Sequence, residues 1–117
     1  MATTRLVGDD RERRAARHLK QHGLKIVTAN YRSRLGEIDI VATDRDCLVF
    51  VEVRYRRNHQ FGRAVTTVDE HKQRKLIMTA QGFLAKHPRL ASRVCRFDVI
   101  GFDGDDVRWL KDAFRPW

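Results

Sequence analysis

Long apolar runs, cysteines and secretion signals are scarce or missing in this chain, and each shortage excludes a class of protein. The longest run of aliphatic and aromatic residues is Leu48 to Val51, whereas a membrane-spanning helix needs about 20 such residues. Met1 to Arg5 leads into charged sequence without the apolar core of a signal peptide, so we expect a cytoplasmic protein with no membrane partner. Cys47 and Cys95 stand apart among apolar neighbours, which favours buried, reduced thiols over a structural zinc site.

The charge balance is strongly positive. The 117 residues, enough for one domain over 1–117 with its own core, include 24 Lys and Arg against 15 Asp and Glu, a formal charge of +9. Arginine outnumbers lysine by 18 to 6. Because arginine binds phosphate through two hydrogen bonds and stacks on bases, the excess favours a nucleic-acid partner. A basic solvated surface, or a genome rich in arginine codons, is the alternative.

Hydrophobic periodicity and turn residues predict an α/β fold with the order α-β-β-β-α-β-β. Capping boxes start both helices, at Asp9 with Glu12 and at Thr67 with Glu70. We expect a meander of three strands, a helical crossover that makes the fourth strand parallel to the third, and one mixed five-stranded sheet flanked by helices. The predicted elements are a helix over 9–22, strands over 24–31, 37–42 and 48–55, a helix between Thr67 and Pro88, and strands over 95–102 and 107–110.

Two carboxylates occupy unusual positions in the middle of apolar strands. Asp39 and Glu52 are equidistant from the turn between the second and third strands, so any turn of even length makes them cross-strand neighbours. Their Cβ atoms would lie about 4.5–5.5 Å apart on one face. Such a pair repels unless a cation lies between the two groups, and Mg²⁺ accepts one or two carboxylates together with water and phosphate oxygens. Arg54 shares the face of Glu52, and a structural ion pair of Arg54 with either carboxylate is the alternative interpretation.

These motifs resemble a known family. Asp39 followed by Glu52-Val53-Arg54 on the next strand resembles the PD-(D/E)XK nuclease superfamily, which includes restriction endonucleases and archaeal Holliday-junction resolvases. More closely, the chain resembles the YraN family of small bacterial proteins. The matching segments are Gly8-x-x-x-Glu12-x-x-Ala15, Asn30-Tyr31-Arg32, Gly36-Glu37-Ile38-Asp39, Val49-Phe50-Val51-Glu52-Val53, Phe61-Gly62, Lys72-Gln73 and Arg96-Phe97-Asp98-Val99-Ile100.

The resemblance implies a restriction-endonuclease-like fold and a Mg²⁺- or Mn²⁺-dependent endonuclease acting on structured or branched nucleic acid, with DNA preferred over RNA. Asp39 and Glu52 would hold the metal, and Glu12 would complete the acidic cluster unless it serves only in its capping box. Arg54 would stabilise charge in the transition state, and Gln73, a polar residue on an otherwise apolar helix face, would orient water or phosphate.

One residue departs from the superfamily pattern and is the reason for an alternative hypothesis about function. Nucleases of this group usually carry lysine at the position of Arg54, and arginine cannot act as a base. A non-catalytic nucleic-acid-binding module that retains the nuclease fold is therefore the second hypothesis. A third is an adaptor whose basic face binds an acidic protein.

Several basic residues near the predicted site are candidates for phosphate contacts, although a solvated polar surface would explain them as well. Asp98 is interpreted as structural, bonding a backbone group. A homodimer would allow symmetric cutting of both strands, but no motif indicates one. The candidate nucleic-acid-binding residues are Arg32, Arg34, Arg56, Arg57, Arg63, Lys72 and Lys75.

Overall fold

The computed structural model describes residues 10–56 and 68–115, which form three helices and one five-stranded sheet. None of the helices in these ranges is long and apolar enough to cross a membrane. Cys47 and Cys95 are free thiols, as expected, but both are half-buried and not fully buried. The helices are α2 (Asp10–Gln21), α3 (Glu70–Lys86) and α4 (Pro88–Ala91), and the strands are β1 (Lys25–Ser33), β2 (Gly36–Asp44), β3 (Cys47–Arg56), β4 (Val94–Asp103) and β5 (Asp106–Phe114).

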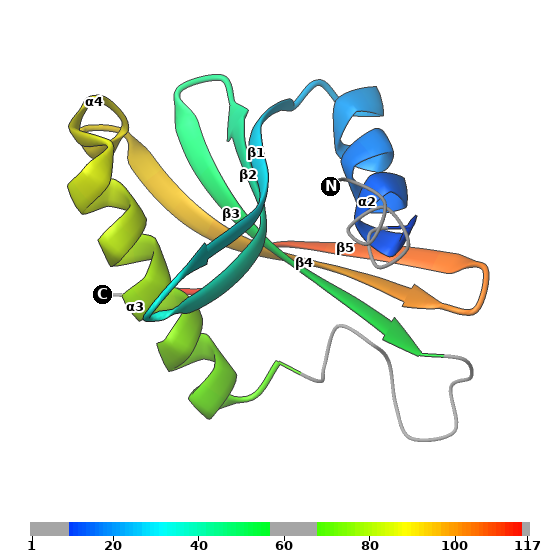
Figure 1. The fold of residues 1–117 in the computed structure, drawn as a ribbon. Helices are drawn as coiled ribbons and strands as arrows, with labels where there is room; N and C mark the ends of the chain where they lie inside the picture. Colours follow the sequence, from blue (N-terminus) through cyan, green and yellow to red (C-terminus); the bar gives the residue numbers. More distant parts are fainter. Residues whose placement is uncertain (1–9, 57–67, 116–117) are drawn as a thin grey trace, which may run out of the picture.

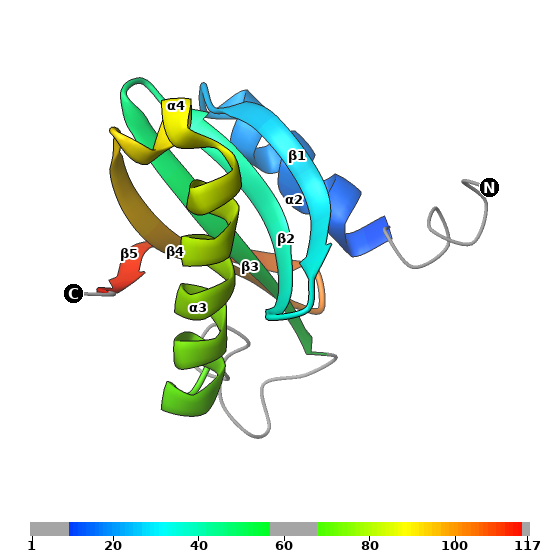
Figure 2. The same cartoon turned by 60° about the vertical axis from the view of Figure 1, so that its left-hand side comes forward.

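The strands lie in sequence order, β1-β2-β3-β4-β5. All neighbours are antiparallel except β3 and β4, which the crossover through α3 and α4 makes parallel. The predicted mixed sheet and its parallel pair are therefore confirmed. α3 covers one face of the sheet and α2 covers the other (Figures 1 and 2).

Because helices cover both faces, the central strands are apolar on both sides. Successive residues of β3 alternate between two cores, one under α3 and one under α2. The core under α3 includes Ile38, Leu48, Phe50, Leu76, Phe83, Phe97 and Val99. The core under α2 includes Ala15, Leu19, Ile40, Val49, Val51, Ile100 and Phe102.

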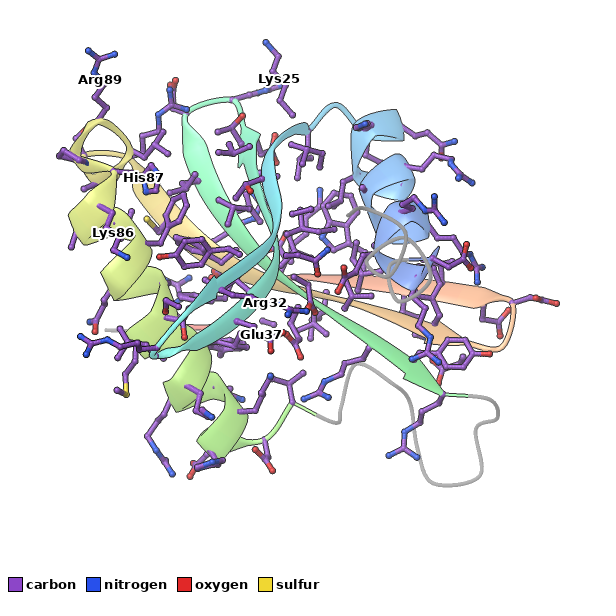
Figure 3. All side chains as sticks on the ribbon, in the orientation of Figure 1. Lys25, Arg32, Glu37, Lys86, His87 and Arg89 are labelled. Carbon is purple, nitrogen blue, oxygen red and sulfur yellow. The ribbon has the colours of Figure 1, made fainter. Side chains whose placement is uncertain are left out.

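The first hairpin is longer and tighter than the sequence predicts. Residues 32–36 were expected to form a loop, but β1 continues to Ser33 and β2 begins at Gly36, which leaves a two-residue turn of Arg34 and Leu35. The ladder continues through Arg32 opposite Glu37, whose exposed side chains also form an ion pair with Nε 3.8 Å from Oε1. Arg32 and Glu37 lie side by side near the tip of the hairpin (Figure 3).

The start of α3 differs from the predicted cap. Asp69 caps α3 by accepting a hydrogen bond from the backbone N–H of Lys72 at 2.9 Å, so the prediction of Thr67 as the cap was wrong. Aspartate caps a helix as well as threonine does, and the charge also favours the helix dipole. Asp9, the predicted cap of the first helix, and Thr67 itself lie outside the described residues.

Candidate functional site

The two predicted acidic residues lie where β2 and β3 separate. The turn between these strands contains two residues, 45 and 46, and the ladder runs from Asp44 opposite Cys47 to Ile40 opposite Val51. One further step of the same register would set Asp39 opposite Glu52, but the ladder ends there, and Ile38 and Ile40 on either side of Asp39 pack into different cores. At this point the Asp39 side chain takes the place of a backbone acceptor, because its Oδ2 accepts the N–H of Val53 at 2.8 Å. The even-length turn on which the prediction depended is thus present.

Glu52 is almost completely buried, with 5% of its surface exposed. It belongs to the side of β3 that faces α3, as do Leu48 and Phe50. Burial, the neighbouring charge of Asp39 and a hydrogen bond with Asp39 together raise the pKa of Glu52 to about 7, against the opposing effect of Lys72 and Arg54. We call Asp39 and Glu52 the acidic pair.

Two cations contact the buried carboxylate. Arg54 Nε lies 3.3 Å and Lys72 Nζ 3.6 Å from the same Glu52 oxygen, Oε2. The structural ion pair considered for Arg54 and Glu52 is therefore present. The pKa of Glu52 is nevertheless raised, first by burial and then by the charge of Asp39.

The position of Lys72 was underestimated from the sequence. Lys72 was placed among the phosphate-facing or solvated residues, whereas it is half-buried and reaches the acidic pair from the first turn of α3. The sequence spacing of Lys72 from the apolar residues of the helix could have indicated this position. Lys72 precedes the buried residues Leu76, Thr79 and Phe83 by four, seven and eleven positions, which places all four on one helix face.

Gln73 and Lys75 lie on the same helix as Lys72. The Gln73 side chain donates a hydrogen bond from Nε2 to the carbonyl of Val68 at 3.1 Å, so in this structure it holds the chain entering α3. Lys75 is exposed. Beside Lys72, a pocket of about 200 Å³ opens between α3 and the start of β2, and it is lined by Gly36, Glu37, Lys72, Lys75 and Leu76.

Glu12 is not brought together with the acidic pair. It is half-buried on α2, three residues before the buried Ala15, and α2 packs on the face of the sheet opposite α3. Residues 10–56 and 68–115 contain no group of three or more His, Cys, Asp or Glu side chains that could hold a metal. Glu12 as a metal ligand stays a prediction.

Those predicted phosphate-binding arginines that the structure describes lie at the first hairpin and at the end of β3. Arg32 is paired with Glu37, and Arg34 is exposed at the tip of the first hairpin. Arg56 ends β3 opposite Asp103. Arg57 and Arg63 lie outside the described residues.

Comparison with known proteins identifies the family. The model of a family described as "Uncharacterised protein family UPF0102" matches residues 11–102. A UPF0102 protein of Alcanivorax borkumensis is 47% identical over 112 residues, which cover 92% of this chain and 90% of that protein. A UPF0102 protein of Xanthomonas oryzae pv. oryzae is 50% identical over 99 residues, 83% of this chain and 81% of that protein. The resemblance to YraN proteins is thus confirmed, and the chain belongs to the family UPF0102.

Proposed function

We propose that this protein is a metal-dependent endonuclease that hydrolyses phosphodiester bonds in structured or branched nucleic acid. DNA is the proposed substrate. The observation that carries the proposal is the acidic pair, in which a buried Glu52 adjoins Asp39 and keeps a raised pKa although Arg54 and Lys72 contact it. A carboxylate pair that costs folding free energy is expected at a functional site more than in a structural core.

The side chains fit a hard divalent cation. Mg²⁺ and Mn²⁺ prefer oxygen ligands, and Mg²⁺ commonly uses one or two carboxylates and fills its other positions with water and phosphate oxygens. Asp39 and Glu52 supply two carboxylates, and the described residues supply no third acidic group beside them. Water and substrate phosphate would therefore complete the coordination.

The roles of the protein side chains follow from their contacts. The chemistry supplied by the cation, when bound, is acidification of a water molecule and neutralisation of negative charge on the phosphate. Arg54 and Lys72 would stabilise the additional negative charge that develops on the phosphate in the transition state. Gln73 would hold the start of α3, and with it Lys72, in place through its bond to Val68.

Lys72 compensates in part for the replacement of the superfamily lysine by Arg54, which favours a non-catalytic module. The superfamily lysine is replaced by Arg54 on β3, but α3 delivers an ammonium group to the same carboxylate oxygen. Lysine is able to lose its proton near a cation, whereas arginine is not. A binding module without catalysis remains the second candidate, favoured by the Glu52–Arg54 contact at 3.3 Å.

A cleavage assay with Mn²⁺ separates the two candidates. Single-stranded, duplex and branched DNA are incubated with the wild type, Asp39→Ala and Asp46→Ala, an exposed aspartate in the β2–β3 turn that serves as the matched control. We expect metal-dependent cutting by the wild type and the control and at least a roughly 100-fold loss in Asp39→Ala. Tight binding without cutting by the wild type would instead support the module.

A further inference from the structure

The tip of the β1–β2 hairpin rests on the middle of α3 and leaves a hollow on each side. A Cβ atom on Gly36 would lie 2.7 Å from Thr79 Oγ1, and one on Gly82 would lie 2.9 Å from Leu35 Cδ1, so the two elements touch at both glycines. Figure 1 shows this hairpin against α3. The hollow toward the amino end of α3 is the pocket beside Lys72. The hollow toward the carboxyl end is a separate pocket of about 320 Å³.

The chemistry of this second pocket suits a phosphate with an apolar group attached. Its lining includes the cations Arg34 and Lys86 and contains no carboxylate. Neither cation has an ion pair with a carboxylate in residues 10–56 or 68–115, and both are exposed. Lys86 extends from the carboxyl end of α3 (Figure 3). Leu35, 42% exposed, adds apolar surface. The full lining is Tyr31, Ser33, Arg34, Leu35, Gly82 and Lys86.

The second pocket lies on the same side of α3 as the acidic pair. Lys72, Lys75, Thr79, Gly82 and Lys86 follow one another at intervals of three and four residues, which keeps them on one helix side. At about 1.5 Å of rise per residue, Gly82 and Lys86 lie about 15 and 21 Å from Lys72 along the helix axis. At about 3.4 Å per nucleotide, the spacing along one strand that keeps the stacking of B-form DNA, this separation corresponds to about four to six nucleotides.

We propose that the pocket between the first hairpin and α3 is a second phosphate subsite for the substrate strand. Arg34 and Lys86 bind a backbone phosphate about four to six nucleotides from the phosphate at the acidic pair, and Leu35 contacts the sugar or base of that nucleotide. The ligand class is a nucleic-acid strand, because the two cations suit a phosphate, Leu35 suits an attached sugar or base, and the volume of about 320 Å³ is near the lower end of small-molecule sites. This inference rests on the proposed function, since it assigns a second contact to the same substrate.

Binding of single-stranded DNA to metal-free protein tests the subsite. The variant Arg34→Ala/Lys86→Ala is compared with Arg17→Ala/Lys20→Ala, which removes one arginine and one lysine from exposed positions on α2, across the sheet. We measure the affinity for a fluorescent oligothymidine strand of about twelve nucleotides, long enough to span both sites, and for one of about three nucleotides. Affinities are measured at several salt concentrations.

We expect the pocket variant to bind the long strand roughly tenfold more weakly at low salt, with the salt slope reduced by about 0.7 for one lost phosphate contact. The short strand and the α2 variant should show no such change. Equal effects of the two double variants on the long strand would overturn the subsite and leave the proposed function standing. A wild type that binds neither strand at low salt would overturn both.

Discussion

The environment of Glu52 differs strongly from that of a glutamate in water. Its pKa is raised to about 7, first by burial and then by Asp39. The folded protein therefore binds a proton that the unfolded chain releases between pH 4.5 and about 7. For an acid with a raised pKa, stability is highest below the unfolded pKa and is lost as the pH rises through the folded value. The free energy of unfolding should fall across this window when no metal is present.

Replacing Glu52 with glutamine should remove most of this dependence on pH. In the presence of a chelator, Glu52→Gln should be more stable than the wild type at pH 8 by up to about 3.5 kcal/mol, since the pKa is raised from 4.5 to about 7 and each pKa unit is worth about 1.4 kcal/mol. Urea unfolding at pH 5 and pH 8 measures the effect. Glu70→Gln, whose side chain is 90% exposed, is the control and should keep the wild-type slope. A variant as pH-dependent as the wild type would show that Glu52 is not the responsible group.

Asp98 is a second buried carboxylate, but its partners are complete. Its two oxygens accept hydrogen bonds from Arg96 Nε at 3.0 Å, Trp109 Nε1 at 2.9 Å and the backbone N–H of Asp112 at 2.9 Å. The bond to Asp112 confirms the interpretation of Asp98 as a structural residue that bonds the backbone. This network lies on the α2 side of the sheet, away from the acidic pair.

Truncation of Asp98 should therefore cost stability. Asp98→Ala removes the acceptor of Trp109 Nε1 and of Arg96 Nε, while Arg96 keeps its ion pair with Asp44, so the free energy of unfolding should fall by about 3 kcal/mol. Chemical denaturation measures the loss, and Asp46→Ala provides an exposed control. A loss below about 1 kcal/mol would contradict the structural role.

At the scale of the secondary-structure elements, the first hairpin contacts α3 at two glycines. Gly36 lies in the hairpin and Gly82 lies in the helix. Gly36 has φ +150°, and an added Cβ would meet Thr79 Oγ1 at 2.7 Å on a buried side chain. Gly82 is in the interior of a helix, and its added Cβ would meet only the flexible end of Leu35. The same methyl group should therefore have opposite effects at the two positions.

We expect Gly36→Ala to destabilise the protein by about 1–3 kcal/mol, because the backbone conformation disfavours a side chain and Thr79 has no room to move. Gly82→Ala should stabilise it by about 0.5 kcal/mol, since alanine favours helix and Leu35 can shift. Thermal unfolding of the two variants measures the difference. A larger loss in Gly82→Ala than in Gly36→Ala would contradict the described contact.

The elements were predictable where local patterns determine them. The apolar segments of β2 and β3 and the position of their turn were sufficient to predict the hairpin and its even-length turn. The sequence also predicted that Asp39 and Glu52 interact, although the ladder ends one step before them. The structure of the hairpin tip was not predictable from local patterns. Arg32 lies opposite Glu37 in the ladder, which extends the strands through residues that favour a loop by themselves. The contact of Lys72 with Glu52 joins positions 20 residues apart through the parallel crossover, and spacing along one helix predicts only the face and not the partner.

At the scale of the whole molecule, the fold places some of the positive charge beside the acidic pair. Net charge alone indicates a polyanionic partner, but it does not locate the contact. In the structure, Lys72, Lys75, Arg34 and Lys86 follow one side of α3 from the acidic pair to the hairpin tip. Four of the 24 basic residues therefore lie on the side of the sheet that carries the acidic pair, as the proposed function requires, whereas α2 carries another basic group across the sheet.

Diffraction from a crystal soaked in Mn²⁺, recorded near the manganese absorption edge, tests the metal site directly. We expect an anomalous peak between the carboxylates of Asp39 and Glu52, and no peak there in Asp39→Ala. No peak in the wild type, with Arg54 and Lys72 in contact with Glu52 as described above, would contradict the hydrolytic function.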